Sequence, residues 1–325
     1  MDPEVVTALV GGWAIAVVGI EYQPVGFGSH HWIASTDGGR WFVTVDDLEA
    51  RRRDPTQTRR DAARHLTTAL QASRTLHDSG LEFVVAPLPT IKGSPTHPIN
   101  SRYVASLFPY VDGISYSWGR FETRGQRLAV LDRITEIHRA SKLLPGVGRQ
   151  DDFMIPSRVE LFSALRGSPT PWGPGPFAEP ARRLLQDNAE GVRRVLARYD
   201  HLVLEIATRV DRHVLTHGEP HRANTITTSE GVVLVDWDTA LRAPPERDLW
   251  AMIDEDPEVS DEYARRTGVT LDEATLTLYR LWWDLCEIAS YIAQFRHHHD
   301  KTEDTKTSWD GLRYHLDTTR WETTL

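Results

Sequence analysis

The chain has 325 residues, of which 40% are hydrophobic and 26% are charged, and its formal net charge is −9. This length and balance leave room for two domains or lobes with a sizeable core, and they exclude wholesale disorder. The negative charge disfavours binding to a nucleic-acid backbone and favours a cationic ligand.

Export and membrane insertion are not expected either. The longest apolar stretch, Ala8 to Ile20, is too short to cross a bilayer. Asp2 and Glu4 precede it, where a signal peptide would carry positive charge. The single cysteine, Cys286, excludes an internal disulfide and fits a reducing compartment, and its apolar neighbours predict a buried thiol. We therefore expect a cytoplasmic protein with no membrane partner.

The first third of the chain predicts a small sheet with one helix. Residues Ile15 to Val45 alternate in strand fashion and are interrupted by turns at 25–29 and 36–39, which predicts three short strands. Helical spacing follows over Ala62 to Leu76. Two further strands complete a predicted five-stranded sheet, over Leu81–Leu88 and Tyr103–Phe108.

Helical periodicity dominates the rest of the chain. Helices are expected over four segments: Gln126–Ala140, Ser157–Leu165, Ala181–Tyr199 and Leu271–Arg296. The sequence thus predicts an α+β fold of two lobes. A small β-rich lobe spans residues 1–107, a hinge spans 108–113, and a large, mainly helical lobe spans 114–325. A cleft between two such lobes is the expected place for a ligand.

One polar segment has the pattern of a catalytic site. A loop over Thr216–Asn224 leads into a hairpin whose apolar second strand, Val232–Val235, ends at Asp236. Glu219, Asn224 and Asp236 are therefore presented by a loop and two strand ends, which can hold oxygen atoms around one point. Amide and carboxylate oxygens suit Mg²⁺. Phosphoryl transfer needs this set: one carboxylate to orient the attacking hydroxyl, and two oxygen ligands for Mg²⁺ beside the nucleotide phosphates.

The same segment resembles the catalytic loop and metal-binding segment of the aminoglycoside phosphotransferase family, the bacterial relatives of protein kinases. The family's loop has the form His-Gly-Asp-x-His-x-x-Asn, and residues 217–224 are His-Gly-Glu-Pro-His-Arg-Ala-Asn. Residues 234–249 are most similar to the spectinomycin phosphotransferase branch. The resemblance extends over most of the chain and implies a protein-kinase-like fold.

The resemblance also implies an activity. It is the Mg²⁺-dependent transfer of the γ-phosphoryl group of ATP or GTP to a hydroxyl of a cationic aminocyclitol or aminoglycoside, an antibiotic-resistance reaction. Glu219 is then the catalytic carboxylate, and Asn224 and Asp236 are catalytic residues that hold the metal. The implied nucleotide-binding residues belong to a loop and to the hinge: Gly26, Phe27, Gly28 and Ser29, with Phe108 and Tyr110.

Acidic residues are candidates for the binding of a cationic substrate. Asp284 and Glu287 are three residues apart and so share one face of the predicted helix Leu271–Arg296. With Asp238 they could form an acidic wall for amino groups. The alternative is that they form an ordinary solvated helix face.

The sequence departs from the family pattern at two positions. Glu219 stands where the family has an aspartate, and its extra methylene changes the reach of the carboxylate. Thr44 stands where the family has a strand lysine that binds the α and β phosphates. Arg40, His30 and His31 are the nearest candidates for a replacement, and the amides of the glycine loop are another.

Two other functions stay open: a pseudokinase-like nucleotide-binding protein, which Thr44 motivates, and a metabolic small-molecule kinase of the choline kinase type. A His-Glu-x-x-His zinc site is excluded, because Gly218 and Pro220 break the helix that it needs. A dinucleotide-binding unit is excluded because a strand follows the glycine loop. His217 and the cluster Glu246-Arg247-Asp248 are expected to be structural.

Overall fold

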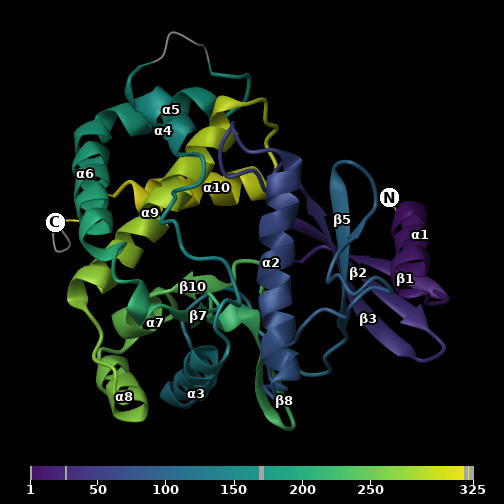
Figure 1. Ribbon diagram of the computed structural model, residues 1–325. Coiled ribbons are helices and arrows are strands. Elements are labelled where there is room, and N and C mark those ends of the chain that lie inside the picture. Colours follow the sequence, from purple (N-terminus) through teal and green to yellow (C-terminus); the bar gives the residue numbers. More distant parts are fainter. Residues whose placement is uncertain (1, 26–27, 168–171, 318–320, 322–325) are drawn as a thin grey trace. The chain divides into compact units, whose positions relative to one another are not determined.

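The structure of the protein is a computed structural model that describes residues 2–25, 28–167, 172–317 and 321 (Figure 1). Its elements group into two units. The first is built from residues 1–52, 57–151 and 211–271, and the second from residues 53–56, 152–210 and 272–325. The lobe boundary expected at residues 108–113 stays a prediction.

The first unit contains an antiparallel five-stranded sheet in the order β1-β2-β3-β5-β4. Its strands are β1 (Gly19–Gln23), β2 (Ser29–Thr36), β3 (Gly39–Asp47), β4 (His97–Pro98) and β5 (Tyr103–Pro109). The predicted run of three strands and the strand over 103–108 are confirmed.

The prediction of a strand over Leu81–Leu88 is wrong, and the fifth strand is β4 instead. The apolar residues 83–86 are all buried, so the segment lacks the alternation of a strand with one exposed face. Its backbone instead makes isolated bonds, one from the Leu88 amide to the Leu107 carbonyl of β5 (2.7 Å) and two with Leu234. The Val85 amide donates to the Leu234 carbonyl (3.0 Å), and the Leu234 amide donates to the Phe83 carbonyl (2.8 Å).

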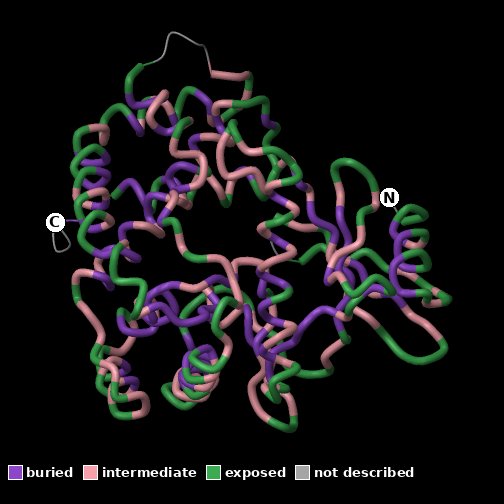
Figure 2. Tube along the Cα trace, viewed as in Figure 1, coloured by how far each residue is buried: buried purple, intermediate pink, exposed green. Residues whose placement is uncertain are grey.

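An N-terminal helix that the sequence did not predict covers one face of the sheet. Helix α1 (Asp2–Trp13) presents Val5, Leu9 and Trp13 at a spacing of four residues, so these side chains share one face. They pack on side chains of β2, β3 and β5: Trp32, Ala34, Val43, Val45, Ala105 and Leu107. Buried residues accordingly recur along the three central strands (Figure 2).

The opposite face of the sheet carries polar side chains beside an aromatic one. Alternation along β3 turns Phe42, Thr44 and Asp46 away from α1. Thr44 pairs with His31 on one side and with Ser106 on the other. Helix α2 (Arg59–Asp78), which confirms the prediction over 62–76, lies beside the sheet on the side away from α1 (Figure 1).

The rest of the first unit carries the polar segment identified in the sequence. Strands β7 (Val214–Thr216) and β10 (Leu241–Ala243) pair with each other, and β6 (Ile114–Ser115), β8 (Thr225–Thr228) and β9 (Gly231–Leu234) form a second small sheet. Gly113 allows β6 to approach β8, because a Cβ there would lie 2.7 Å from the Thr227 carbonyl oxygen. The helices are α3 (Arg124–Ala140), as predicted, α7 (Glu246–Glu255) and α8 (Glu258–Thr267), with short 3₁₀ turns at Ser141–Leu143, Val210–Arg212 and Arg222–Asn224.

The second unit is helical. It contains α4 (Arg158–Leu165), α5 (Ala178–Asp187), α6 (Ala189–Ile206), α9 (Glu273–Arg296) and α10 (Glu303–His315). The single helix predicted over 181–199 is wrong, because the chain breaks at Asn188, whose side-chain amide donates to the Leu184 carbonyl (2.8 Å) and ends α5. Cys286 is half-buried rather than buried. In the part of the chain that the structure describes, no helix is long and apolar enough to cross a membrane.

Candidate active site

The loop after β7 is anchored by a buried arginine from the start of α7. Arg247 donates to the Thr216 hydroxyl (2.8 Å) and to the Thr239 carbonyl (3.1 Å). Gly218 lies against this guanidinium with φ of +103°, and a Cβ would come within 2.4 Å of it. Both the backbone conformation and the close approach therefore require glycine at the second position of the loop.

His217 connects the loop to the strand end that carries Asp236. Its ring is fully buried, and burial lowers its pKa, so the imidazole is neutral. Nε2–H donates to the Val235 carbonyl (2.8 Å), while Nδ1 accepts from the Glu219 amide (3.3 Å). One neutral tautomer satisfies both bonds. The structural role expected for His217 is confirmed, and the ring holds the backbones of two catalytic candidates in register.

Asp248 in α7 holds the same loop through its backbone amides. Its buried carboxylate accepts from the His217 amide (3.0 Å), the Gly218 amide (2.6 Å) and Nε2–H of His138 (3.1 Å). Burial works to raise the pKa of Asp248, but the bond from His138 and nearby cations outweigh it, and the pKa lies below its usual value. A permanently charged acceptor therefore fixes the two amides, as expected for a structural residue.

Asp248→Ala is expected to lower the free energy of unfolding by about 3 kcal/mol or more, because it leaves three buried donors without an acceptor. The control is Asp261→Ala, which removes an exposed carboxylate of α8 and should change stability by about 0.5 kcal/mol or less. Urea unfolding of both variants measures the difference. Equal stability of the two variants would contradict the anchoring role.

The side chain of Glu219 is accessible although its backbone is fixed. About a third of it is exposed (31%), and Oε2 lies 3.6 Å from Nε2 of His221. The His221 ring in turn packs edge-on against Trp118, with centroids 4.2 Å apart. A carboxylate on a fixed backbone and open to solvent can approach an incoming hydroxyl.

Asn224 is oriented by the same loop. Its side-chain Nδ2 donates to the Glu219 carbonyl (3.0 Å) and lies 3.3 Å from Nε2 of His221. Among the residues that the structure describes, none donates a hydrogen bond to Oδ1, which leaves this oxygen for a ligand. The Asn224 carbonyl accepts from the Val235 amide (3.0 Å), so the two strand ends are bonded next to Asp236.

Asp236 is exposed and has φ of +65°, a left-handed conformation that is uncommon outside glycine. The neighbouring carboxylate of Asp238 raises its pKa well above the usual value, and Glu219 adds to the effect. The charges of Asp238 and Glu219 thus both oppose a charge on Asp236. This electrostatic situation favours the binding of a cation.

Asp238 is engaged by an arginine that the sequence analysis did not single out. The guanidinium of Arg51, in the turn after β3, forms an ion pair with Asp238 and another with Asp46 (2.7 Å). Ser29, at the start of β2, donates to Asp46 (2.6 Å). The only signal in the sequence is the run of three arginines at 51–53, six residues after the predicted strand ends at Val45.

The other predicted nucleotide-binding residues are partly described. Gly26 and Phe27 lie outside the described residues, and Gly28 precedes β2 with φ of +87°. Phe108 is buried in β5 opposite Phe42, and Tyr110 follows directly after the strand. Their role in binding a base stays a prediction.

The three residues that the sequence analysis offered as replacements for a lysine at position 44 have other partners. Arg40 lies over the Tyr110 ring, 3.9 Å from its centroid, and forms an ion pair with Asp112 (2.7 Å). His31 stacks on Phe42 and bonds to the Val25 carbonyl (2.7 Å). His30 is an exposed residue of β2 within an aromatic group that contains Tyr22, Trp32 and Tyr103.

Asp284 and Glu287 belong to the second unit and share one face of α9. Asp284 is buried and accepts from Nδ1–H of His315 (2.6 Å) and from the Trp321 indole (3.1 Å). Glu287 is half-buried and accepts from the Tyr291 hydroxyl. Both oxygens of Asp284 thus serve buried donors, and of the two residues Glu287 is the more accessible for a substrate.

Within the described ranges, no group of three or more His, Cys, Asp and Glu side chains could hold a metal ion by itself. The donors at the candidate site are instead one amide oxygen, of Asn224, and one carboxylate, of Asp236. This all-oxygen pair fits Mg²⁺, which is bound by one or two protein groups and completes its shell with water and phosphate oxygens.

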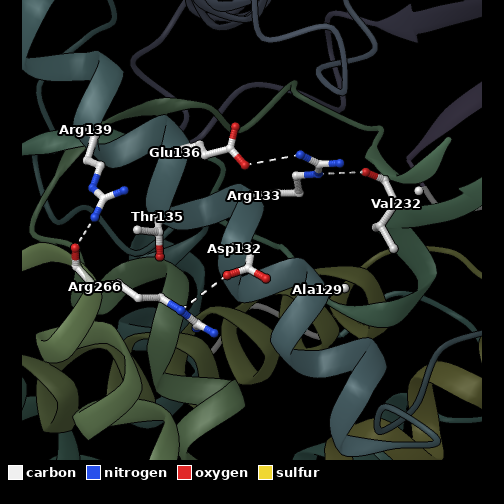
Figure 3. Close-up of a pocket in the computed structure, with 9 residues that line it drawn as sticks. Ala129, Asp132, Arg133, Thr135, Glu136, Arg139, Val232 and Arg266 are labelled. Carbon is white, nitrogen blue, oxygen red and sulfur yellow. Dashed lines mark hydrogen bonds and ion pairs between the residues drawn. The ribbon is translucent and has the colours of Figure 1, made fainter.

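A separate hollow of about 470 Å³ in the first unit is lined by α3, the start of β9 and Arg266 (Figure 3). The lining residues form two ion pairs: Arg133 with Glu136 (3.1 Å), within α3, and Arg266 with Asp132 (3.2 Å). The predicted site residues are not among those that line it.

Comparison with known proteins identifies the family. Residues 21–282 match the family described as the phosphotransferase enzyme family, which covers most of the chain. The chain belongs to this family. The phosphotransferase is 30% identical to protein StrN of Streptomyces griseus over 273 residues, or 79% of each chain.

Solved structures confirm the predicted α+β, protein-kinase-like fold. A spectinomycin phosphotransferase in complex with ADP and spectinomycin matches this phosphotransferase with a TM-score of 0.73 and 16% identity, over 99% of this chain and 98% of the other. An amicoumacin kinase with AMP-PNP and Ca²⁺ matches with a TM-score of 0.64 and 12% identity, over 98% and 94% of the two chains. The predicted resemblance to the aminoglycoside phosphotransferases is therefore confirmed at the level of family and fold.

Proposed function

We propose that this phosphotransferase transfers the γ-phosphoryl group of ATP or GTP to a hydroxyl of a cationic aminocyclitol or aminoglycoside-type antibiotic. The observation that carries the proposal is a set of hydrogen bonds that joins the three catalytic candidates. The His217 ring bonds to the Glu219 amide and to the Val235 carbonyl, next to Asp236. Asn224 bonds to the Glu219 carbonyl through its side chain and to the Val235 amide through its own carbonyl. The loop that presents an accessible carboxylate and one oxygen ligand is thereby bonded to the strand end that carries the second oxygen ligand, the arrangement that phosphoryl transfer uses.

Glu219 orients the acceptor hydroxyl and takes its proton. As the acceptor oxygen bonds to the γ-phosphorus, the bond from that phosphorus to the β–γ bridging oxygen breaks and the nucleoside diphosphate leaves. Asn224 Oδ1 and Asp236 would hold Mg²⁺, which when bound supplies positive charge to the phosphate oxygens. His217 and Asp248 act only through the backbone, by holding the loop in place.

The carboxylates and the net charge of −9 support a cationic acceptor. A structural relative solved with spectinomycin supports the same class. Of the three acids that the sequence offered for substrate binding, we assign Asp238 and Glu287. Asp284 instead supports its face of α9, because both of its oxygens accept from buried donors. We assign nucleotide binding to residues 26–29 and to Phe108 and Tyr110. Two structural relatives solved with ADP or AMP-PNP support a nucleotide donor.

Intact-mass detection of product tests the substrate class. The purified protein is incubated with Mg²⁺, ATP or GTP, and a panel of aminocyclitols, aminoglycosides, choline and uncharged polyols. We expect a gain of one phosphate on a cationic aminocyclitol or aminoglycoside and on none of the polyols. Phosphorylation of choline alone would assign the protein to metabolic kinases instead.

A further inference from the structure

Arg51 is held at the acidic site by three side chains of the first unit. Its Nε donates to Asp46 (2.8 Å), and Nη2 donates to the Ser29 hydroxyl (3.2 Å) and forms the ion pair with Asp238. The arginine thus joins the start of β2, the end of β3 and the Asp-Trp-Asp segment. These positions are far apart in sequence, since Arg51 and Asp238 are separated by 187 residues.

The contacts orient the guanidinium without using all of it. Asp46 is buried and is itself fixed by the bond from Ser29 (2.6 Å). Among the described residues, none accepts a hydrogen bond from Nη1, and 22% of the Arg51 side chain is exposed. Burial opposes the charge, but Asp238 and Asp46 raise the pKa of Arg51, so it stays cationic. Part of this fixed cationic side chain is therefore exposed beside the carboxylate of Asp238.

No lysine of the described chain occupies the corresponding face of the sheet. Thr44 lies two residues before Asp46 on the same face of β3 and is neutral. The four lysines of the chain lie elsewhere in the sequence: Lys92, Lys142, Lys301 and Lys306. A polyphosphate that approaches Glu219, Asp236 and Asp238 meets strong repulsion unless a cation accompanies it.

We infer that Arg51 binds the phosphates of the nucleotide donor and takes the place of a lysine at position 44. The inference rests on the proposed function, because it concerns the donor of that reaction. The planar guanidinium can bind two phosphate oxygens at once, whereas Asp46 and Ser29 keep it in a fixed direction. Because Arg51 would touch the donor, it is a catalytic residue rather than a positioning one.

The test compares binding of a non-hydrolysable triphosphate with binding of the matching nucleoside. Arg51→Gln is expected to weaken triphosphate binding about 10- to 100-fold and to leave nucleoside binding within about 2-fold, because the proposed contacts of Arg51 with the nucleotide are to its phosphates alone. The matched control is Arg59→Gln, which removes another arginine of the first unit that is paired with a carboxylate, Glu49 (2.7 Å). It should change neither affinity.

Arg51→Lys keeps the positive charge and one donor to Asp46. It therefore tests the proposal even if Arg51→Gln does not fold. It should retain nucleoside binding and lose several-fold in triphosphate affinity, because lysine cannot bind two oxygens in a plane. Equal losses for nucleoside and triphosphate, or affinities like those of Arg59→Gln, would overturn the assignment. A failure of the proposed function is distinguishable, because the unmodified protein would then bind no triphosphate or transfer no phosphate.

Discussion

Asp236→Ala is expected to abolish phosphoryl transfer, with a fall in kcat of about 10³-fold or more. The substitution removes the only carboxylate assigned to Mg²⁺, and Asn224 alone offers a single neutral oxygen. The measurement is the initial rate of product formation at saturating nucleotide and acceptor. A variant that retains a tenth of the original rate would contradict the metal assignment.

Asp236→Asn separates this loss from misfolding. Alanine at φ of +65° costs about 1–2 kcal/mol of strain, whereas asparagine adopts the left-handed conformation more readily. Asparagine also removes the repulsion from Asp238 that raises the pKa of Asp236. We expect Asp236→Asn to be at least as stable as the unmodified protein and still inactive. Its nucleotide binding should no longer respond to the addition of Mg²⁺.

Glu219→Gln is expected to leave nucleotide binding intact and to reduce transfer by about 10²- to 10⁴-fold. The amide has the size of the carboxylate but cannot take a proton from the acceptor. The Glu219 amide and carbonyl, which bond to His217 and Asn224, are unchanged by the substitution. Nucleotide affinity and kcat are measured on the same sample. Transfer within about 5-fold of the unmodified rate would show that another group orients the hydroxyl.

Glu219→Asp tests whether the loop is adapted to the longer side chain. Shortening the side chain by one methylene withdraws the carboxylate by about 1 Å, which can cost about 10²-fold in rate. We expect a lower rate with unchanged nucleotide affinity. A gain in rate would show instead that Glu219 is a weakened substitute for aspartate.

The sequence predicted correctly those elements whose own residues carry a local pattern, such as alternation, turn residues or an apolar stripe. The meander of β1, β2 and β3 has alternation and turn residues, and α2 has a capped apolar stripe. Strand β4 has only two residues, too few for a period, and forms because β5 offers it a partner. The prediction for segment 81–88 is wrong because a continuous apolar run is equally typical of a buried strand and of a buried extended segment outside a sheet.

The same distinction holds for the site. Glu219, Asn224 and Asp236 lie within one loop and hairpin, so their spacing alone indicates that they are close together. Arg51 meets Asp238 only through the tertiary fold. Likewise the sequence cannot distinguish an acid open to substrate from one bound by distant residues, as Asp284 is by His315 and Trp321.

The most direct test of the central claim is the stoichiometry of the reaction of the unmodified protein. With Mg²⁺, nucleoside triphosphate and a cationic aminocyclitol or aminoglycoside, we predict one phosphorylated acceptor for each nucleoside diphosphate formed, and neither product when EDTA replaces Mg²⁺. Mg²⁺-dependent binding of nucleotide, with no phosphorylated product from any acceptor of the panel, would contradict the account and identify a pseudokinase-like nucleotide-binding protein.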